Sequence, residues 1–268
     1  MSNIYKFDED ECFLLPVGLY RNGKYYREIH LDGWVGMDQE QLTSASTRKN
    51  PSRGLTAVLQ RLTQEITGLM ERKRDPFSRC AAHWFEDMFQ CDRDAILLKS
   101  LVLSDDCEQE VDFTCPKCQE ELVEDVDLRD LEIHAHGEGS PFVDFTLQSP
   151  IRLSIENTDS DKKKFELVEF RDVRFHLPTG KNQAKVSQAA KKGEHHALSV
   201  LISQCLEIKG FSGRLTIEQV RRLRKKTRRE IQEALSELTP GVDLTKRVEC
   251  PSCGAKSDLM IDLSNFFR

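Results

Sequence analysis

Residues 248–267 read "VECPSCGAKSDLMIDLSNFF" and hold two cysteines, Cys250 and Cys253, in a CPxC turn. A turn of this kind presents two thiolates to one metal ion, but a tetrahedral zinc site needs four ligands. The sequence has no second pair of cysteines close by. The position of the two missing ligands therefore decides how the chain must fold.

A comparison of the chain with itself finds the second pair. The segment "TCPKCQEELVEDVDLRDL" at 114–131 aligns without gaps with "ECPSCGAKSDLMIDLSNF" at 249–266, and the offset is constant at 135. Cys115 then matches Cys250, and Cys118 matches Cys253. The 131 residues between the two pairs are far more than the roughly 15–20 residues of a local zinc ribbon. This spacing favours two copies of one module, each of which contributes one pair.

The repeat continues upstream with weaker similarity. "RDAILLKSL" at 93–101 resembles "RREIQEALS" at 228–236, and "RGLTAVLQRLTQEI" at 53–66 resembles "HALSVLISQCLEI" at 196–208. The offset drifts from 135 to about 144 further upstream, as loop insertions in a duplicated module produce.

The fold class that we predict is α+β, with two tandem related units joined across a shared metal site. Each unit contains a β-hairpin, helices and a CPxC strand pair. The units span residues 1–135 and 136–268, and the glycine-rich segment "IHAHGEGSP" at 133–141 is the expected linker.

Local patterns predict several elements inside these units. Asn22 and Gly23 lie between β-type residues and indicate a two-residue hairpin turn. Residues 141–177 alternate between apolar and polar side chains and predict strands, which a polar loop at 157–164 interrupts. Thr216 begins a capping-box pattern for one long helix, which should end before Pro240.

The four paired cysteines predict one structural Zn²⁺ per chain, because four thiolates leave no open position for catalysis. Three alternatives remain: the pairs are turns without metal, two chains share an ion, or Cys107 joins the first pair. We interpret the other five cysteines as reduced core residues, since irregular spacing argues against disulfides. The metal ligands are Cys115, Cys118, Cys250 and Cys253, and the five others are Cys12, Cys80, Cys91, Cys107 and Cys205.

A basic run provides a candidate partner-binding surface. The predicted unit at 1–135 carries a net charge of −11 and that at 136–268 carries +5. The run attracts phosphates, but it contains no aromatic residue to stack on bases. A solvated face, docking against the acidic first unit or binding of an acidic partner therefore has at least as much support as nucleic acid, and the sequence does not choose among them. Its members are Arg221, Arg222, Arg224, Lys225, Lys226, Arg228 and Arg229.

Other classes of protein find little support in the sequence. No apolar run approaches the roughly 20 residues of a membrane span, and residues 1–16 lack the pattern of a secretory signal, so we expect a cytoplasmic protein. The sequence has no phosphate-binding glycine loop and no GxSxG elbow, so we expect no enzyme. The histidine pairs at 134 and 136 and at 195 and 196 lack metal-binding helical spacing and are interpreted as linker or surface residues.

The order of three segments suggests a family. "FLLPVGLYRNGKYYREIHLDGWVGMDQEQL" is followed by "FTCPKCQEELVEDVDL" and finally by "VECPSCGAKSDLMIDLSNFF". This combination resembles the T-even-type baseplate proteins of contractile phage tails and phage-tail-like injection systems, best over about the first 130 residues.

The resemblance implies a non-enzymatic baseplate hub component, assembly factor or chaperone. Its partners would be other tail proteins, such as hub, spike or tape-measure proteins, and it leaves open whether the protein stays in the finished particle. The alternative hypothesis is a zinc-dependent nucleic-acid-binding regulator that uses the basic run at 221–229.

Overall fold

The computed structural model describes residues 4–44, 47–48, 51–69, 80–136, 141–157 and 164–261. Over these residues the chain is mixed α+β, with eight α-helices and 13 strands. It forms two compact units: unit 1 is Met1–Glu138 with Pro240–Arg268, and unit 2 is Gly139–Thr239. The chain passes from unit 1 to unit 2 after Glu138, close to the boundary expected near residue 135. It returns to unit 1 at Pro240, whereas the predicted units 1–135 and 136–268 include no such return.

The first layer of unit 1 is a three-stranded sheet in the order β2-β3-β4. β2 (Cys12–Arg21) and β3 (Lys24–Leu31) form the predicted hairpin. Its turn residues, Asn22 and Gly23, have φ of +50° and +79°, which a tight hairpin turn of this kind requires. The hairpin prediction is therefore confirmed.

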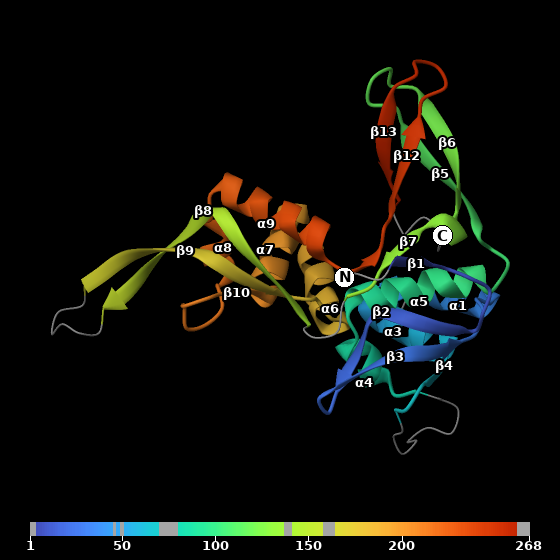
Figure 1. The fold of residues 1–268 in the computed structure, drawn as a ribbon, viewed down its shortest axis with the longest axis horizontal. Helices are drawn as coiled ribbons and strands as arrows, with labels where there is room; N and C mark the ends of the chain where they lie inside the picture. Colours follow the sequence, from blue (N-terminus) through green and yellow to red (C-terminus); the bar gives the residue numbers. More distant parts are fainter. Residues whose placement is uncertain are drawn as a thin grey trace. The chain divides into compact units, whose positions relative to one another are not determined.

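Helices cover this sheet (Figure 1). The central helix, α5 (Gln90–Val102), is buried along most of its length and packs against β2, β3 and α3. α3 runs without a loop into β4, which pairs with β3. The remaining elements of this layer are α1 (Gly36–Thr43), α3 (Pro51–Leu62), β4 (Thr63–Ile66) and α4 (Ala82–Asp87).

α5 also supports an irregularity in β2, where the register shifts between Leu14 and Leu19. The backbone N–H groups of Val17 and Gly18 donate to the carboxylate of Asp92 at 2.8 and 2.9 Å. Because a bulge takes such donors out of the strand ladder, the buried carboxylate supplies the acceptors that they need.

A second sheet holds the chain where it returns to unit 1. Its order is β1-β7-β11, and the central strand pairs antiparallel with both neighbours. Gly241 in β11 lies opposite His134 in β7, so residues more than 100 positions apart become neighbours. The strands are β1 (Ile4–Lys6), β7 (Glu132–His134) and β11 (Gly241–Val242).

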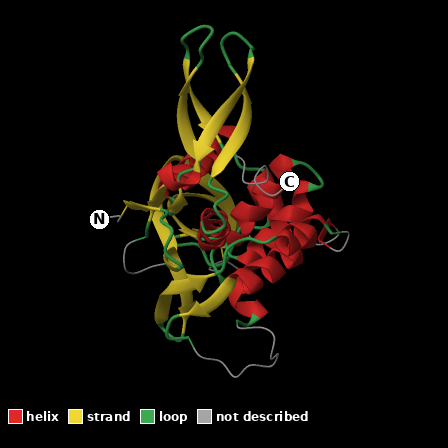
Figure 2. Cartoon of the chain, turned by 90° about the vertical axis from the view of Figure 1, so that its right-hand side faces the viewer, coloured by secondary structure: helices red, strands yellow, loops and turns green. Residues whose placement is uncertain are grey.

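Two β-ribbons project from this region and lie side by side, as Figures 1 and 2 both show. Each ribbon is a separate two-stranded antiparallel sheet. The first consists of β5 (Glu108–Thr114) and β6 (Glu121–Asp127), and a 3₁₀ turn at Leu128–Asp130 follows it. The second consists of β12 (Thr245–Glu249) and β13 (Lys256–Met260).

Unit 2 repeats the arrangement of the first layer of unit 1. A long hairpin is followed by helices, and α7 runs directly into a third strand that pairs with the second hairpin strand. Its sheet order is β8-β9-β10. The elements are β8 (Phe142–Asn157), β9 (Lys164–His176), α6 (Gly180–Ala190), α7 (Glu194–Cys205), β10 (Leu206–Ile208), α8 (Ile217–Arg221) and α9 (Lys225–Leu238).

The similarity reaches individual hydrogen bonds. The register of β8 shifts between Thr146 and Ile151, and in this bulge the amides of Gln148 and Ser149 donate to the carboxylate of Glu230 on α9. Asp92 on α5 binds the bulge of β2 in the same way.

The two long helices also contact their neighbouring helices similarly. Arg93 on α5 donates to Thr56 of α3 at 3.5 Å, and Arg228 on α9 donates to Ser199 of α7 at 3.1 Å. These residues occupy matching positions in the upstream segments that resemble each other in sequence.

The long helix predicted from Thr216 is present as two helices rather than one. Thr216 forms the predicted capping box with Gln219, but α8 ends at Arg221 and α9 begins at Lys225. A continuous helix would place Arg221 and Arg222 one turn from Lys225 and Lys226, and such like-charge pairs are destabilising. Within α8 and its C-cap, both arginines pair with Glu218.

Some predictions lie outside the described residues. These are the linker glycines at 137 and 139, most of the polar loop at 157–164, and the two phenylalanines at 266 and 267. Among the helices that the structure describes, none combines the length and the apolar character needed to cross a bilayer.

Candidate metal centre

The tip of the first ribbon places Cys115 and Cys118 in a tight turn. The amide of Cys115 donates to the carbonyl of Glu120, and the amide of Gln119 donates back to the carbonyl of Cys115, both at 2.9 Å. Gln119 has φ of +61°, the left-handed conformation that turns the chain back into β6. Both thiols are thereby held on one short loop.

The tip of the second ribbon has the same hydrogen bonds. The amide of Cys250 donates to Ala255, and the amide of Gly254 donates to Cys250, again at 2.9 Å. Gly254 has φ of +65° and occupies the position of Gln119 at the offset of 135. The gapless sequence repeat therefore corresponds to two turns of one geometry.

The two tips bring the four sulfurs together. The Sγ atoms of Cys115 and Cys253 are 3.8 Å apart, and those of Cys118 and Cys250 are 3.6 Å apart. All four lie within 4.8 Å of one another, and no disulfide joins them. Four sulfurs placed tetrahedrally at about 2.3 Å from one zinc ion would be about 3.8 Å apart, so the spacing fits a single tetrathiolate ion.

Burial divides the cluster into an inner and an outer side. Cys115 and Cys250 are 0% and 1% exposed, whereas Cys118 is exposed and Cys253 is half-buried. Each pair therefore offers one thiol from inside the ribbons and one from the rim. Such an ion would be attached firmly to the protein and would still be reachable from solvent.

The electrostatics of the cluster favour a cation. The backbone amides of Cys118 and Lys117 lower the pKa of the Cys115 thiol to about 6. The amide of Glu120 also lowers the pKa of Cys118, but the neighbouring thiols outweigh it and raise that pKa to about 12. One thiolate forms readily and disfavours the next, because like charges repel. A bound dication would remove this penalty.

Below the cysteines, apolar residues hold the ribbons against each other. Val111 and Val126 in the first ribbon and Val248 and Leu259 in the second are all buried and belong to the core of unit 1. Lys246 also reaches across to Glu124, with 2.7 Å between Nζ and Oε1. The contact between the ribbons thus extends from the four cysteines to the roots.

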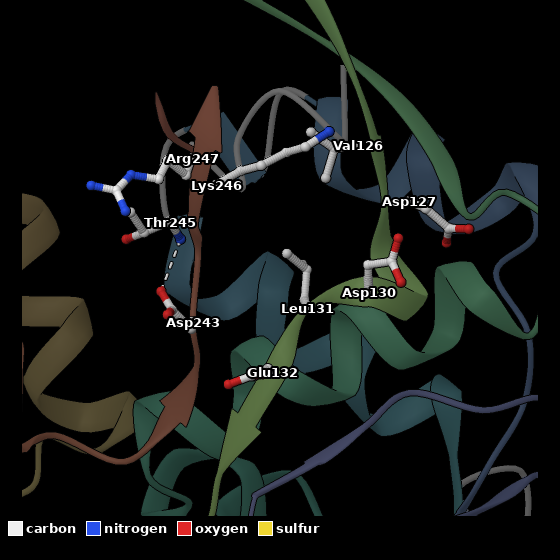
Figure 3. Close-up of a pocket in the computed structure, with 9 residues that line it drawn as sticks. All are labelled: Val126, Asp127, Asp130, Leu131, Glu132, Asp243, Thr245, Lys246 and Arg247. Carbon is white, nitrogen blue, oxygen red and sulfur yellow. Dashed lines mark hydrogen bonds between the residues drawn. The ribbon is translucent and has the colours of Figure 1, made fainter. Parts of the chain in front are cut away.

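A pocket of about 260 Å³ lies at the roots of the ribbons (Figure 3). Two of its carboxylates have partners inside unit 1: Asp127 binds Arg129 at 2.7 Å, and Asp243 accepts the amide of Thr245 at 2.9 Å. The pocket lies at the junction of the two ribbons with β7. It is lined by Val126, Asp127, Asp130, Leu131, Glu132, Asp243, Thr245, Lys246 and Arg247.

The basic run belongs to unit 2, whereas the cysteine cluster belongs to unit 1. Arg221, Arg222 and Arg229 form ion pairs with glutamates on their own helices, and Arg228 binds α7. Arg224, Lys225 and Lys226 are exposed. The run is thus partly neutralised and partly open to solvent.

Fold and site together define a class: an α+β protein in which two ribbons carry a cysteine cluster with the geometry of a structural metal site. A family model goes further. The family described as "T4 bacteriophage base plate protein" matches residues 22–268, nearly the whole chain. The chain belongs to this family, and membership supports a structural role in a phage baseplate.

The family match confirms the resemblance drawn from the sequence. It also covers the second half, where that resemblance depended mainly on the last cysteine pair. Searches of curated proteins and of solved structures gave no significant match.

Proposed function

We propose that this protein is a non-enzymatic structural adaptor or assembly factor of a contractile phage tail or phage-tail-like injection system. Family membership supports the setting. The observation that supports the mechanism is the sulfur spacing of 3.6 and 3.8 Å across the two ribbon tips. One Zn²⁺ per chain, bound by Cys115, Cys118, Cys250 and Cys253, would fix the ribbons to each other.

The ion has a structural role in this proposal. Four thiolates fill a tetrahedral shell, so no position remains for a water nucleophile or a substrate. A tetrahedral set of four sulfurs suits zinc and also iron, and metal analysis of the purified chain distinguishes the two. Structural zinc contributes on the order of 10 kcal/mol in small zinc modules.

The four cysteines lie on both sides of unit 2 in the sequence, so a bound ion would link the two segments of unit 1. Residues 139–239 form unit 2, and the chain enters and leaves it from unit 1. The zinc would join a ribbon that precedes unit 2 to a ribbon that follows it. Both connections to unit 2 would then start from one rigid base, which suits a protein that must present two different surfaces to its partners.

We also propose that the two halves of the chain arose by tandem duplication. Equivalent ribbon tips support this origin, as do equivalent sheet orders and the equivalent bulges bound by Asp92 and Glu230. In this view the second copy is divided, because its layer forms unit 2 while its ribbon packs with unit 1. The boundaries 1–135 and 136–268 would then mark the two duplicated copies, whereas the compact units of the fold have different boundaries.

Unit 2 would supply the partner-binding surface. It holds 19 Lys and Arg against 13 Asp and Glu, a net charge of +6. Arg224, Lys225 and Lys226 are exposed at the junction of α8 and α9, and an acidic patch on another tail protein would complement them. We propose that hub, spike or tape-measure proteins provide such a patch, during particle assembly in the cytoplasm.

Co-expression with the neighbouring tail genes tests this function. The tagged chain should co-purify with baseplate or tail proteins and carry one zinc ion at the tetrathiolate site. Reversal of Arg224, Lys225 and Lys226 to Glu should weaken this association at least tenfold. A matched control reverses Lys185, Lys191 and Lys192, which are exposed elsewhere on unit 2, and should leave it unchanged.

The alternative function gives a different result. A regulator that binds nucleic acid through α9 would shift bulk DNA in a salt-sensitive way and would lose that shift on reversal of the same three charges. DNA binding of this kind, without any tail protein in the co-purified material, would overturn the proposal.

A further inference from the structure

The outward face of the β2-β3-β4 sheet brings together three side chains that the sequence analysis did not connect. In β2 and β3, Phe13 and Ile29 point into the core. Cys12, Glu28 and His30 alternate with them and therefore lie on the opposite face. The Sγ of Cys12, a ring nitrogen of His30 and a carboxylate oxygen of Glu28 all lie within 4.8 Å of one another.

The strand register explains this proximity. Cys12 lies opposite His30, and Leu14 lies opposite Glu28. The amide of Leu31 donates to the carbonyl of Glu11 at 2.9 Å, so the next pair, Cys12 and His30, is a non-hydrogen-bonded pair. Cα atoms in such pairs are about 4.5 Å apart and their side chains come closest.

We infer that Cys12, Glu28 and His30 form a second divalent-metal site, which takes a borderline transition metal such as Zn²⁺. A thiolate and an imidazole select zinc, cobalt or nickel over magnesium or calcium, which prefer oxygen ligands. Three protein ligands leave one coordination position open to solvent, unlike the closed shell of four thiolates.

The surroundings support the ligand set. The hydroxyl of Thr67 donates to Glu28 Oε1 at 2.9 Å and so orients the carboxylate, as second-sphere partners of metal ligands commonly do. Glu65 in β4 lies opposite His30 on its other side and is exposed. The site therefore has a net negative environment.

The two sites should differ in how readily they exchange metal. Cys12 and His30 are half-buried and Glu28 is exposed, whereas two of the four thiols of the tetrathiolate cluster are almost fully buried. With one ligand fewer and more solvent contact, the second site should bind zinc more weakly and lose it first to a mild chelator.

Native mass spectrometry of the full chain, titrated with zinc, tests the inference. The unaltered chain should bind two ions. Cys12→Ser and His30→Gln should each bind one, whereas the control Cys107→Ser, a half-buried cysteine outside both clusters, should keep two. Thr67→Val should retain the second ion with roughly 10-fold weaker affinity.

A separate variant keeps this inference independent of the proposed function. Cys115→Ser combined with Cys118→Ser removes one whole pair from the tetrathiolate cluster and should still leave one bound ion, which Cys12→Ser in the same chain should abolish. Circular dichroism confirms that each variant is folded. A single ion in the unaltered chain under excess zinc, or a second ion that survives Cys12→Ser, would overturn the second site while the tetrathiolate site stands.

Discussion

The two ribbons of unit 1 have matching tips but different roots. The first ribbon continues from α5 and leads through a 3₁₀ turn into β7, and the amide of Leu128 donates to Cys107 at its base at 2.8 Å. The second ribbon follows β11, which is only two residues long. Its base has the matching bond, from the amide of Ile261 to Leu244 at 2.8 Å, and one further backbone bond to β7, from the amide of Asp243 to Glu132. A repeated sequence can thus form the same turn twice and still depend on different contacts for its placement.

This contrast indicates which ribbon needs the metal more. The first is anchored by its continuity with the most buried helix of unit 1. The second is connected to the rest of unit 1 through residues 139–239, which form a separate unit. We therefore expect the zinc to hold mainly the second ribbon in place.

The largest expected effect follows from removal of metal ligands. Cys250→Ser combined with Cys253→Ser removes one whole pair of thiols, so it should abolish zinc binding at the tetrathiolate site and lower the free energy of unfolding of unit 1 by several kcal/mol, up to the order of 10 kcal/mol seen in small zinc modules. Hydrogen exchange should show amides in β12 and β13 losing protection, while those in β5 and β6 keep most of theirs. Equal loss in both ribbons would show that the roots do not differ in strength.

The next prediction compares the stability lost when the carboxylate that binds each bulge is changed to an amide. Asp92 is fully buried, and an amide side chain can replace only one of its two acceptor oxygens, so Asp92→Asn should cost about 1–3 kcal/mol. Glu230→Gln changes the residue that binds the bulge of β8, but Glu230 is only half-buried and water can replace the lost acceptor, so the cost should stay under about 1 kcal/mol. Urea denaturation measures both, and a larger loss for Glu230→Gln would refute the burial argument.

The stabilising effect of Asp92 should also depend on pH. Burial is the largest cause of the raised pKa of Asp92, which is about 7 against an ordinary 3.8. A carboxyl whose pKa is higher in the folded state contributes stability that is complete below the unfolded pKa and is lost as pH rises through 7. The free energy lost on Asp92→Asn should therefore be greater at pH 6 than at pH 8.

Two glycine substitutions, one at the root and one at the tip of the second ribbon, compare how strongly these two ends constrain the backbone. Gly241 in β11 has φ of +136°, and an added Cβ would lie 3.0 Å from the Cβ of Cys91, so Gly241→Ala should cost about 1–3 kcal/mol. Gly254 has φ of +65° with nothing within 4 Å of an added Cβ, and Gln119 occupies the same conformation in the first tip. Gly254→Ala should therefore cost only about 1 kcal/mol. Thermal unfolding of zinc-loaded protein ranks the two, and the reverse order would mean that the tip is the more constrained end.

The cysteine site could be predicted from the sequence because its information is local and repeated. The two CPxC turns of this chain have the same hydrogen bonds, and the constant offset of 135 in the sequence sufficed to match Cys115 with Cys250. The Asn22–Gly23 hairpin was predictable for a similar reason, since its turn type requires positive φ.

The remaining features depend on contacts that no local pattern encodes. Where the chain returns to unit 1, two residues of β11 pair with β7. A strand of two residues is too short to be recognised from a sequence pattern. The break between α8 and α9 relieves like-charge pairs between Arg221, Arg222, Lys225 and Lys226, and the apolar periodicity of 217–238 carries no sign of it. The cluster of Cys12, Glu28 and His30 arises only from the register of β2 on β3.

The central claim is that four thiolates from the two ribbons surround one ion. X-ray absorption at the zinc edge tests it most directly, on the Cys12→Ser variant loaded with one equivalent of zinc so that the second site does not contribute. The account predicts four sulfur neighbours at about 2.3 Å and no lighter ligand. Fewer than four sulfurs, or a nitrogen or oxygen neighbour at about 2.0 Å, would contradict it.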